Sequence, residues 1–248
     1  PAVQQPGSKP PVVYLAGGPG GSALSAAQGA RWPLFEAVRQ THDVILLDQR
    51  GTGQSAPPPP CPHRASADPT VAHDHAARVL AVQELAQRCL AHWRGLGLDP
   101  DAFNTADSAA DLRVLQKALK AEALSLWGMS YGTHLALAAL KQPGLTIDRL
   151  LLMGVEGPDQ TLKLPLQADE LLARVGQAAG VPDLVERLRA RLEAVAREPL
   201  RLEGPAPLVV SAFDLQLLVA GMLGRQQTAR MIPSVVGGLE AGDATFLG

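Results

Sequence analysis

Four short, largely hydrophobic runs are separated by longer mixed segments in the N-terminal part of the chain. They cover residues 12–15, 44–47, 124–127 and 150–153, and each is too short to form a buried helix. Strands that are apolar on both faces are typical of parallel sheets covered by helices. The pattern therefore predicts an α/β fold with a mostly parallel sheet.

Helical patterns lie between these runs. An apolar stripe repeats at three- and four-residue steps from Ala109 to Leu119, and Thr105 or Ser108 can cap the start of this helix. Proline-rich residues 56–69 break the alternation and indicate an irregular excursion. Further helices are expected over residues 31–40, 71–93 and 131–141.

The alternation of strands and helices ends near residue 158. Beyond it, Leu184, Leu188 and Val195 recur at helical spacing, and a second apolar stretch covers residues 208–223. We therefore expect two parts. Residues 1–158 form a sheet with helices on both faces, and residues 159–248 form a helical cap or lid segment.

Composition narrows the class of protein. Of the 248 residues, 46% are hydrophobic and 19% charged, which is enough apolar material for a sizeable core. The net charge of −2 gives no basic excess, so we expect no nucleic-acid partner. No run approaches the roughly 20 apolar residues of a membrane helix, so no membrane partner is expected either. We see no ligand set for a metal or a cofactor.

The segment Gly128-Met129-Ser130-Tyr131-Gly132 lies between an expected strand and an expected helix. Glycines two residues before and after a serine allow a sharp, strained turn that lifts the hydroxyl above the end of the strand. The helix that follows points its first amides toward that position. This context favours Ser130 as a catalytic nucleophile over a serine in an ordinary tight turn.

A glycine-rich loop, Gly17-Gly18-Pro19-Gly20-Gly21, follows the first expected strand. Its spacing matches neither of the phosphate-binding glycine motifs. An oxyanion hole needs a backbone amide close to the acyl oxygen, and glycines permit that approach. The loop is interpreted as part of an oxyanion hole, with a plain strand-to-helix turn as the alternative.

Taken together, three segments resemble one family. They are Leu15–Gly21, Asp48–Ser55 and Gly128–Thr133, in this order and each at the end of an expected strand. The set is similar to the serine peptidases of the proline iminopeptidase and tripeptidyl aminopeptidase group, which are α/β-hydrolases. The resemblance extends from Val12 to about Pro158. Ala16 departs from it, because members often carry histidine before the two glycines.

This resemblance implies a function and a site. It implies that Ser130 is the nucleophile, that the amides of Gly18 and Tyr131 form the oxyanion hole, and that a helical cap covers the site. The expected reaction is removal of N-terminal residues or short peptides. The segment Asp48–Ser55 is expected to brace the site without a catalytic role.

The catalytic base is missing from its expected place. In this fold the triad runs serine, acid, histidine along the chain, but no histidine follows His134. His134 lies four residues after the serine, so we expect local packing instead. Glu156 and Asp159 follow the fourth run, and either could supply the acid. Glu156 could alternatively bind a substrate ammonium group, or be a solvated loop residue.

The expected C-terminal strands are also absent. We therefore expect this chain to be the N-terminal portion of a longer hydrolase, ending inside its cap, with its leader removed or trimmed. In this chain alone Ser130 should react slowly. The alternatives are a carboxylesterase acting on small esters, and a non-catalytic fragment that binds ligands or assembles with another chain. The oligomeric state is not indicated.

Cys61 and Cys89 are the two cysteines. Secreted members of the resembled group often carry a pair in this region, which implies a disulfide and a periplasmic or extracellular home. The alternative is two reduced, buried cysteines in a cytoplasmic protein.

Overall fold

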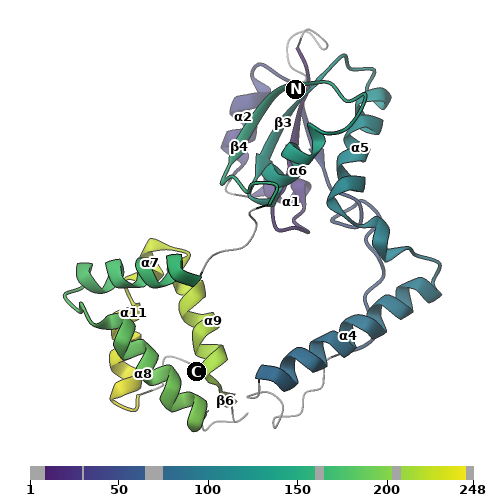
Figure 1. Cartoon of the computed structure of the whole chain (residues 1–248). Coiled ribbons are helices and arrows are strands. Elements are labelled where there is room, and N and C mark those ends of the chain that lie inside the picture. The colour runs from purple at the N-terminus through teal and green to yellow at the C-terminus, as the bar shows by residue number, and fades with distance from the viewer. Residues whose placement is uncertain (1–8, 30, 65–74, 160–164, 203–207, 244–248) are drawn as a thin grey trace. The chain divides into compact units, whose positions relative to one another are not determined.

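The computed structural model describes residues 9–29, 31–64, 75–159, 165–202 and 208–243 (Figure 1). The chain separates into two compact units. The first unit comprises Pro1–Cys61 with Leu90–Thr161, and the second comprises Pro62–Cys89 with Leu162–Gly248. The boundary between residues 161 and 162 lies close to the expected division at residue 158. The inclusion of Pro62–Cys89 in the second unit was not expected.

A four-stranded sheet forms the centre of the first unit. All its pairings are parallel, in the order β2-β1-β3-β4, which confirms the expected parallel sheet. The strands are β1 (Val12–Leu15), β2 (Val44–Leu47), β3 (Leu124–Met129) and β4 (Ile147–Met153).

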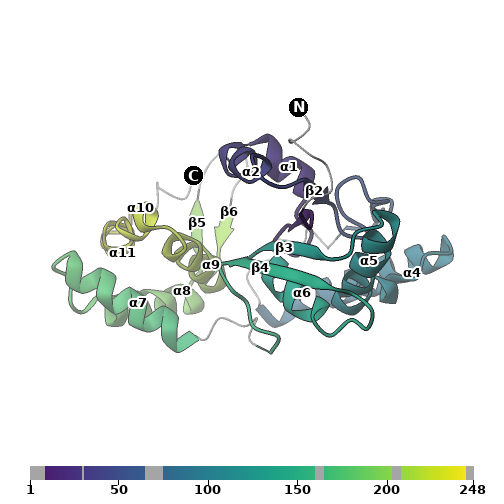
Figure 2. The same ribbon diagram turned by 90° about the horizontal axis from the view of Figure 1, so that it is seen from above.

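Helices pack on both faces of this sheet, as Figure 2 shows. Because successive side chains of a strand point to opposite faces, β1 contributes to two cores. Val13 and Leu15 pack with one pair of helices, while Tyr14 packs with the other pair and with Trp127. The first pair is α5 (Thr105–Ala118) and α6 (Tyr131–Ala139), and the second is α1 (Ala23–Gln28) and α2 (Trp32–Arg39).

The fourth strand differs from its expected burial. Leu150 and Leu152 pack against the core, whereas Leu151 is 51% exposed and Met153 37% exposed. Within the described residues β4 pairs with β3 alone, so it lies at an edge of the sheet. The face of β4 that carries Leu151 and Met153 is therefore exposed, although the run 150–153 is apolar throughout.

The cap of helix α5 also differs from the expectation. The Asn104 side chain, not that of Thr105 or Ser108, accepts the hydrogen bond from the Asp107 amide at 2.8 Å. Ser108 is instead buried, and the Thr105 hydroxyl lies 2.9 Å from the Tyr131 hydroxyl. The contact between Thr105 and Tyr131 links α5 to the start of α6.

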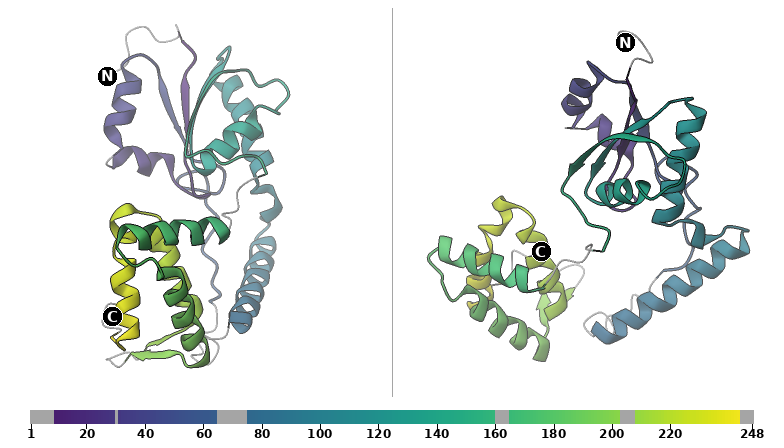
Figure 3. Two further views of the ribbon diagram at one scale, coloured as in Figure 1. Left: turned by 60° about the vertical axis from the view of Figure 1, so that its left-hand side comes forward. Right: turned by 45° about the horizontal axis from the view of Figure 1, so that its top comes forward.

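The second unit is mainly helical, but it contains a small sheet that was not expected. Strands β5 (Leu200–Leu202) and β6 (Leu208–Val210) pair antiparallel. The apolar stretch 208–223 is therefore divided, because a capping box between Ser211 and Asp214 starts a helix after β6. The helices, green to yellow in Figure 3, are α7 (Pro165–Ala178), α8 (Leu184–Arg197), α9 (Ala212–Leu223), α10 (Gln226–Ala229) and α11 (Ile232–Glu240).

Helix α4 (His75–Gly95) explains why Pro62–Cys89 groups with the second unit. Near its start, Arg78 forms a 2.7 Å ion pair with Asp214 of α9. The His75 ring also lies 4.6 Å from the Phe213 ring. These are long-range side-chain contacts, which hydrophobic periodicity does not reveal. A short 3₁₀ helix (Pro100–Ala102) follows α4 in the first unit.

Cys61 and Cys89 form a disulfide, as expected. It joins the proline-rich excursion to helix α4, and the Trp93 indole donates a 2.8 Å hydrogen bond to the Pro59 carbonyl nearby. The irregular segment is thus attached to the helix by a covalent bond and a polar contact.

Replacing both cysteines by serine should lower the free energy of unfolding by about 3 kcal/mol, because the bridge restricts the unfolded chain. Urea denaturation of the oxidised protein and of the double variant measures the difference. Reductant should destabilise the parent and leave the variant unchanged. Equal stabilities of the oxidised parent and the variant would show that this disulfide adds nothing.

Candidate active site

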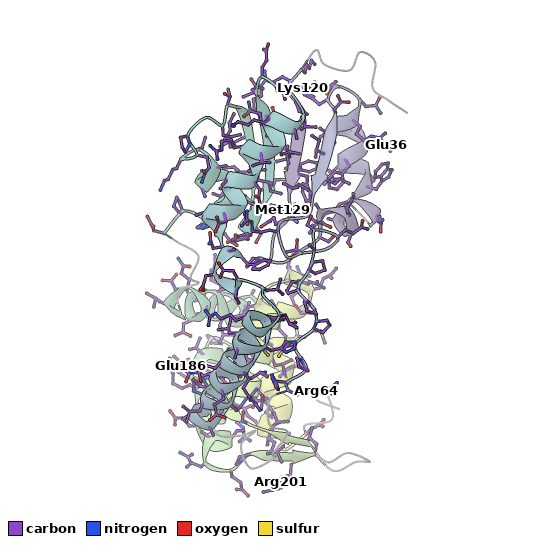
Figure 4. All side chains as sticks on the ribbon, turned by 90° about the vertical axis from the view of Figure 1, so that its right-hand side faces the viewer. Glu36, Arg64, Lys120, Met129, Glu186 and Arg201 are labelled. Atoms are coloured by element: carbon purple, nitrogen blue, oxygen red, sulfur yellow. The ribbon has the colours of Figure 1, made fainter. Side chains whose placement is uncertain are left out.

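Ser130 occupies a strained turn between β3 and α6. Its backbone has φ 52° and ψ −124°, a conformation that non-glycine residues rarely adopt. The Ser130 amide donates to the Met153 carbonyl at 2.8 Å, which ties the turn to the end of β4. In Figure 4, Met129 marks this carboxyl end of the sheet and Lys120 the opposite end. The turn therefore projects from the end of the sheet at which the parallel strands have their carboxyl termini.

The two glycines of the motif have no room for a side chain. A Cβ on Gly128 would lie 2.5 Å from the Gly132 carbonyl oxygen, and one on Gly132 would lie 2.0 Å from the Leu15 carbonyl oxygen. Helix α6 therefore starts directly against β1 and β3. This close approach of backbones explains the spacing of glycines around Ser130.

The glycine-rich loop after β1 lies beside the turn. A Cβ on Gly17 would lie 3.0 Å from the Cβ of Ser130 and 2.8 Å from the Met129 carbonyl oxygen. Gly18 has φ 124°, a backbone conformation that favours glycine, and its peptide bond to Pro19 is cis. Tyr131 is the first residue of α6, so its amide has no acceptor within the helix. The structure thus brings the loop and the helix start together at Ser130.

The segment after β2 supports this loop. Asp48 is buried and accepts hydrogen bonds from the Ser22 hydroxyl and from the amides of Ala23, Leu24 and Gln54. Burial alone would raise the pKa of this carboxyl, but the four hydrogen bonds outweigh it and hold the pKa below its usual value. The ionised carboxylate therefore stabilises the fold at neutral pH, and this stability is lost as the pH falls through the lowered pKa.

The next two residues extend the same support. The Gln49 side-chain amide donates to the Ala16 carbonyl, directly before the glycine loop, at 3.2 Å. The Arg50 guanidinium donates to both carboxylate oxygens of Asp111 on α5, at 2.6 and 2.8 Å. These contacts are those of a structural brace.

Glu156 lies next to the serine hydroxyl. Ser130 Oγ donates a 2.9 Å hydrogen bond to Glu156 Oε1. The backbone amide of Glu156 donates to Thr133 Oγ1 at 2.8 Å, and Thr133 Oγ1 donates to the Ser130 carbonyl at 2.7 Å. The sequence placed Glu156 after the fourth strand without indicating this contact. Thr133 was not singled out, although its position directly after the second motif glycine was a usable signal.

The other candidate acid and base residues are not at the hydroxyl. His134 Nδ1 lies 3.2 Å from the Gly157 carbonyl oxygen, and its ring stacks on Tyr131 at 5.7 Å, in keeping with local packing. Asp159 is exposed. Within the described part of the chain, no imidazole bonds to Ser130 Oγ. His73 lies outside the described residues.

The described residues include neither a cluster of metal-ligating side chains nor a membrane-spanning helix. They contain no group of acidic, histidine or cysteine side chains arranged to hold a metal ion. None of the described helices is long and apolar enough to cross a membrane.

Parts of this chain are similar in sequence to proteins of known name. A tripeptidyl aminopeptidase from Streptomyces coelicolor is 34% identical over 134 residues, which are 50% of this chain and 24% of that protein. The serine protease Hip1 from Mycobacterium tuberculosis is 28% identical over 207 residues, 76% of this chain and 36% of that protein. The chain thus spans about a quarter to a third of the length of these relatives.

Among solved structures, a proline iminopeptidase-related protein from Thermus thermophilus matches 88% of this chain and 66% of its own, with a TM-score of 0.37 and 22% identity. The family model described as the alpha/beta hydrolase fold matches residues 10–201, more than half of the chain. Its match includes the sheet, the strained serine and the glycine loop. The chain belongs to the α/β-hydrolase fold family.

Proposed function

We propose that this chain carries the nucleophile of a serine hydrolase that releases N-terminal residues or short peptides. The observation that carries the proposal is the strained backbone of Ser130, which holds its hydroxyl beside the Gly17–Gly18 loop. Backbone strain that persists in a well-packed setting is a common mark of functional sites. The names of the two relatives, an aminopeptidase and a serine protease, support the reaction class.

In the proposed reaction, Ser130 Oγ attacks the carbonyl carbon of the scissile peptide bond, the C–N bond breaks, and the rest of the peptide leaves as a protonated amine. Water then hydrolyses the acyl-enzyme, which releases the N-terminal product and restores the serine. The amides of Gly18 and Tyr131 would donate hydrogen bonds to the oxygen that becomes negatively charged. Such preorganised donors are typically worth 10²- to 10³-fold each in rate. The proposal expects the base that takes the hydroxyl proton to be a residue other than those that contact Ser130 in this structure.

We further propose that Glu156 binds the substrate's ammonium group. In an amino acid the nitrogen lies about 2.5 Å from the carbonyl carbon, because two bonds of about 1.5 Å separate them. A carboxylate 2.9 Å from the attacking oxygen is therefore within reach of the ammonium of the residue under attack. In a tripeptidyl substrate the ammonium lies two residues farther away, by up to about 7 Å. If Glu156 holds the ammonium group, this geometry favours release of single N-terminal residues over release of short peptides.

Replacing Glu156 by glutamine should remove the preference for a free amine. Alanyl p-nitrophenyl ester and p-nitrophenyl propionate differ by that amine alone. The ratio of their kcat/KM values should fall about 10- to 100-fold in E156Q, the range expected for a lost charged hydrogen bond. A tripeptidyl ester should be affected much less.

The readout separates the possible outcomes. Activity on p-nitrophenyl propionate should fall much less than activity on the alanyl ester, because the propionate has no ammonium to lose, although E156Q also changes the acceptor of the Ser130 hydroxyl. If E156Q keeps the parent's preference for alanyl ester, Glu156 does not bind the ammonium. If the tripeptidyl ester suffers the larger loss, the inferred one-residue release is wrong.

Peptidase and esterase activities are distinguished by substrate. The proposal expects the protein expressed from its complete gene to cleave aminoacyl-β-naphthylamides. Turnover of p-nitrophenyl acetate with no cleavage of any aminoacyl-β-naphthylamide would favour a carboxylesterase, because the same turn and amides serve both reactions.

We also propose that the protein functions in the periplasm or outside the cell. The disulfide between Cys61 and Cys89 supports this location, because such bridges persist in oxidising compartments.

A further inference from the structure

Thr133 holds together the two parts of the candidate site. It is fully buried in the first turn of α6. Its hydroxyl donates a hydrogen bond to the Ser130 carbonyl at 2.7 Å and accepts one from the Glu156 amide at 2.8 Å. A hydroxyl carries one proton, so donation to Ser130 leaves its lone pairs for Glu156. The orientation of the hydroxyl is thereby fixed.

Among the described contacts of the segment that carries Glu156, the bond to Thr133 is the one that holds the Glu156 backbone amide. Val155 is 62% exposed and gives the segment no apolar anchor. Gly154 has φ 65°, and Gly157 follows on the other side. Besides the Thr133 contact, the bond between the Gly157 carbonyl and His134 ties this segment to α6. The buried hydroxyl therefore fixes the backbone of Glu156 itself.

We infer that Thr133 is a positioning residue that sets recognition of the substrate's ammonium group through Glu156. This inference rests on the proposed function. Because the same hydroxyl bonds the Ser130 backbone and the Glu156 backbone, it fixes the distance between nucleophile and carboxylate. Loss of this bond leaves the Glu156 amide without its partner and allows the carboxylate to move away from Ser130.

The test compares two changes at Thr133 in the protein expressed from its complete gene. Valine has nearly the shape of threonine but no hydroxyl, whereas serine keeps the hydroxyl and loses a methyl group. The readout is the ratio of kcat/KM for alanyl p-nitrophenyl ester to that for p-nitrophenyl propionate. T133V should lower this ratio about five- to tenfold, and T133S should keep it within about twofold.

A double variant tests whether Thr133 acts through Glu156. If it does, T133V combined with E156Q should show the ratio of E156Q alone, since the two changes remove one shared effect. Should T133V not fold, as judged by circular dichroism, T133C replaces it, because a thiol fills the space and bonds weakly.

Two results would overturn the inference. Equal losses on both esters would show that Thr133 supports the turn in general, and an unchanged ratio would show that it does not position Glu156. The proposed function fails separately, through an S130A variant that still turns over both esters.

Discussion

Replacing Ser130 by alanine should reduce hydrolysis of aminoacyl substrates by about 10⁴- to 10⁶-fold, the range measured when a serine hydrolase loses its nucleophile. The hydroxyl is the atom that forms the covalent bond, and no neighbouring group replaces it. The strained turn and the amides of Gly18 and Tyr131 would remain, so a small acceleration over water should survive. Steady-state kinetics on the protein from its complete gene measures the loss.

The matched control is S22A, in the same unit. Ser22 also carries a half-buried hydroxyl, which donates a hydrogen bond to Asp48. It is the N-cap of α1 and does not belong to the Ser130 turn. We expect this variant to keep its kcat/KM within a few-fold while losing some stability. An S130A protein as active as S22A would remove the serine-hydrolase interpretation.

Replacing Gly132 by alanine should destabilise the first unit by about 3 kcal/mol or more, because the added methyl overpacks a junction of backbones. The new Cβ would lie 2.0 Å from the Leu15 carbonyl oxygen, and backbone atoms cannot rotate away as a side chain does. Urea denaturation of the variant, compared with the parent, measures the change. Ser130 should lose reactivity as well, since its turn would shift.

Gly95 is the control for this substitution. A Cβ added there meets nothing within 4 Å, so G95A should change the free energy of unfolding by no more than about 0.5 kcal/mol. Equal stabilities of G132A and G95A would contradict the close approach of α6 to β1.

Local signals explain what the sequence could predict. Each apolar run became a strand, because short runs bounded by glycine or polar residues leave few other structures. The Ser130 turn and the loop at Gly17 could be placed because glycine spacing reports the backbone directly. The structure then put these two segments in contact, as expected for the ends of adjacent parallel strands.

Contacts between distant residues explain what the sequence missed. Arg78 and Asp214 are 136 positions apart, so nothing near α4 indicated that its start groups with the second unit. Strands β5 and β6 each span three residues, which is too few for a hydrophobic pattern to indicate a strand. Asn104 is the N-cap of α5 because it directly precedes the helix, whereas Thr105 is the first helical residue.

The candidate site shows the same division. Ser130 was identified from five consecutive residues, whereas the bond from its hydroxyl to Glu156 required the turn, β4 and the segment after it to be placed together. Thr133 connects these parts from a buried position, and its place directly after the second motif glycine was the local signal for it in the sequence. The contacts of Glu156 therefore depend on tertiary structure more than the position of Ser130 does.

Covalent labelling tests the central claim most directly. The protein expressed from its complete gene is treated with a fluorophosphonate, digested, and mapped by peptide mass spectrometry. The proposed function predicts one adduct, on Ser130, and no adduct in the S130A variant. An adduct on a different residue, or undiminished labelling of S130A, would contradict the claim that Ser130 is the nucleophile.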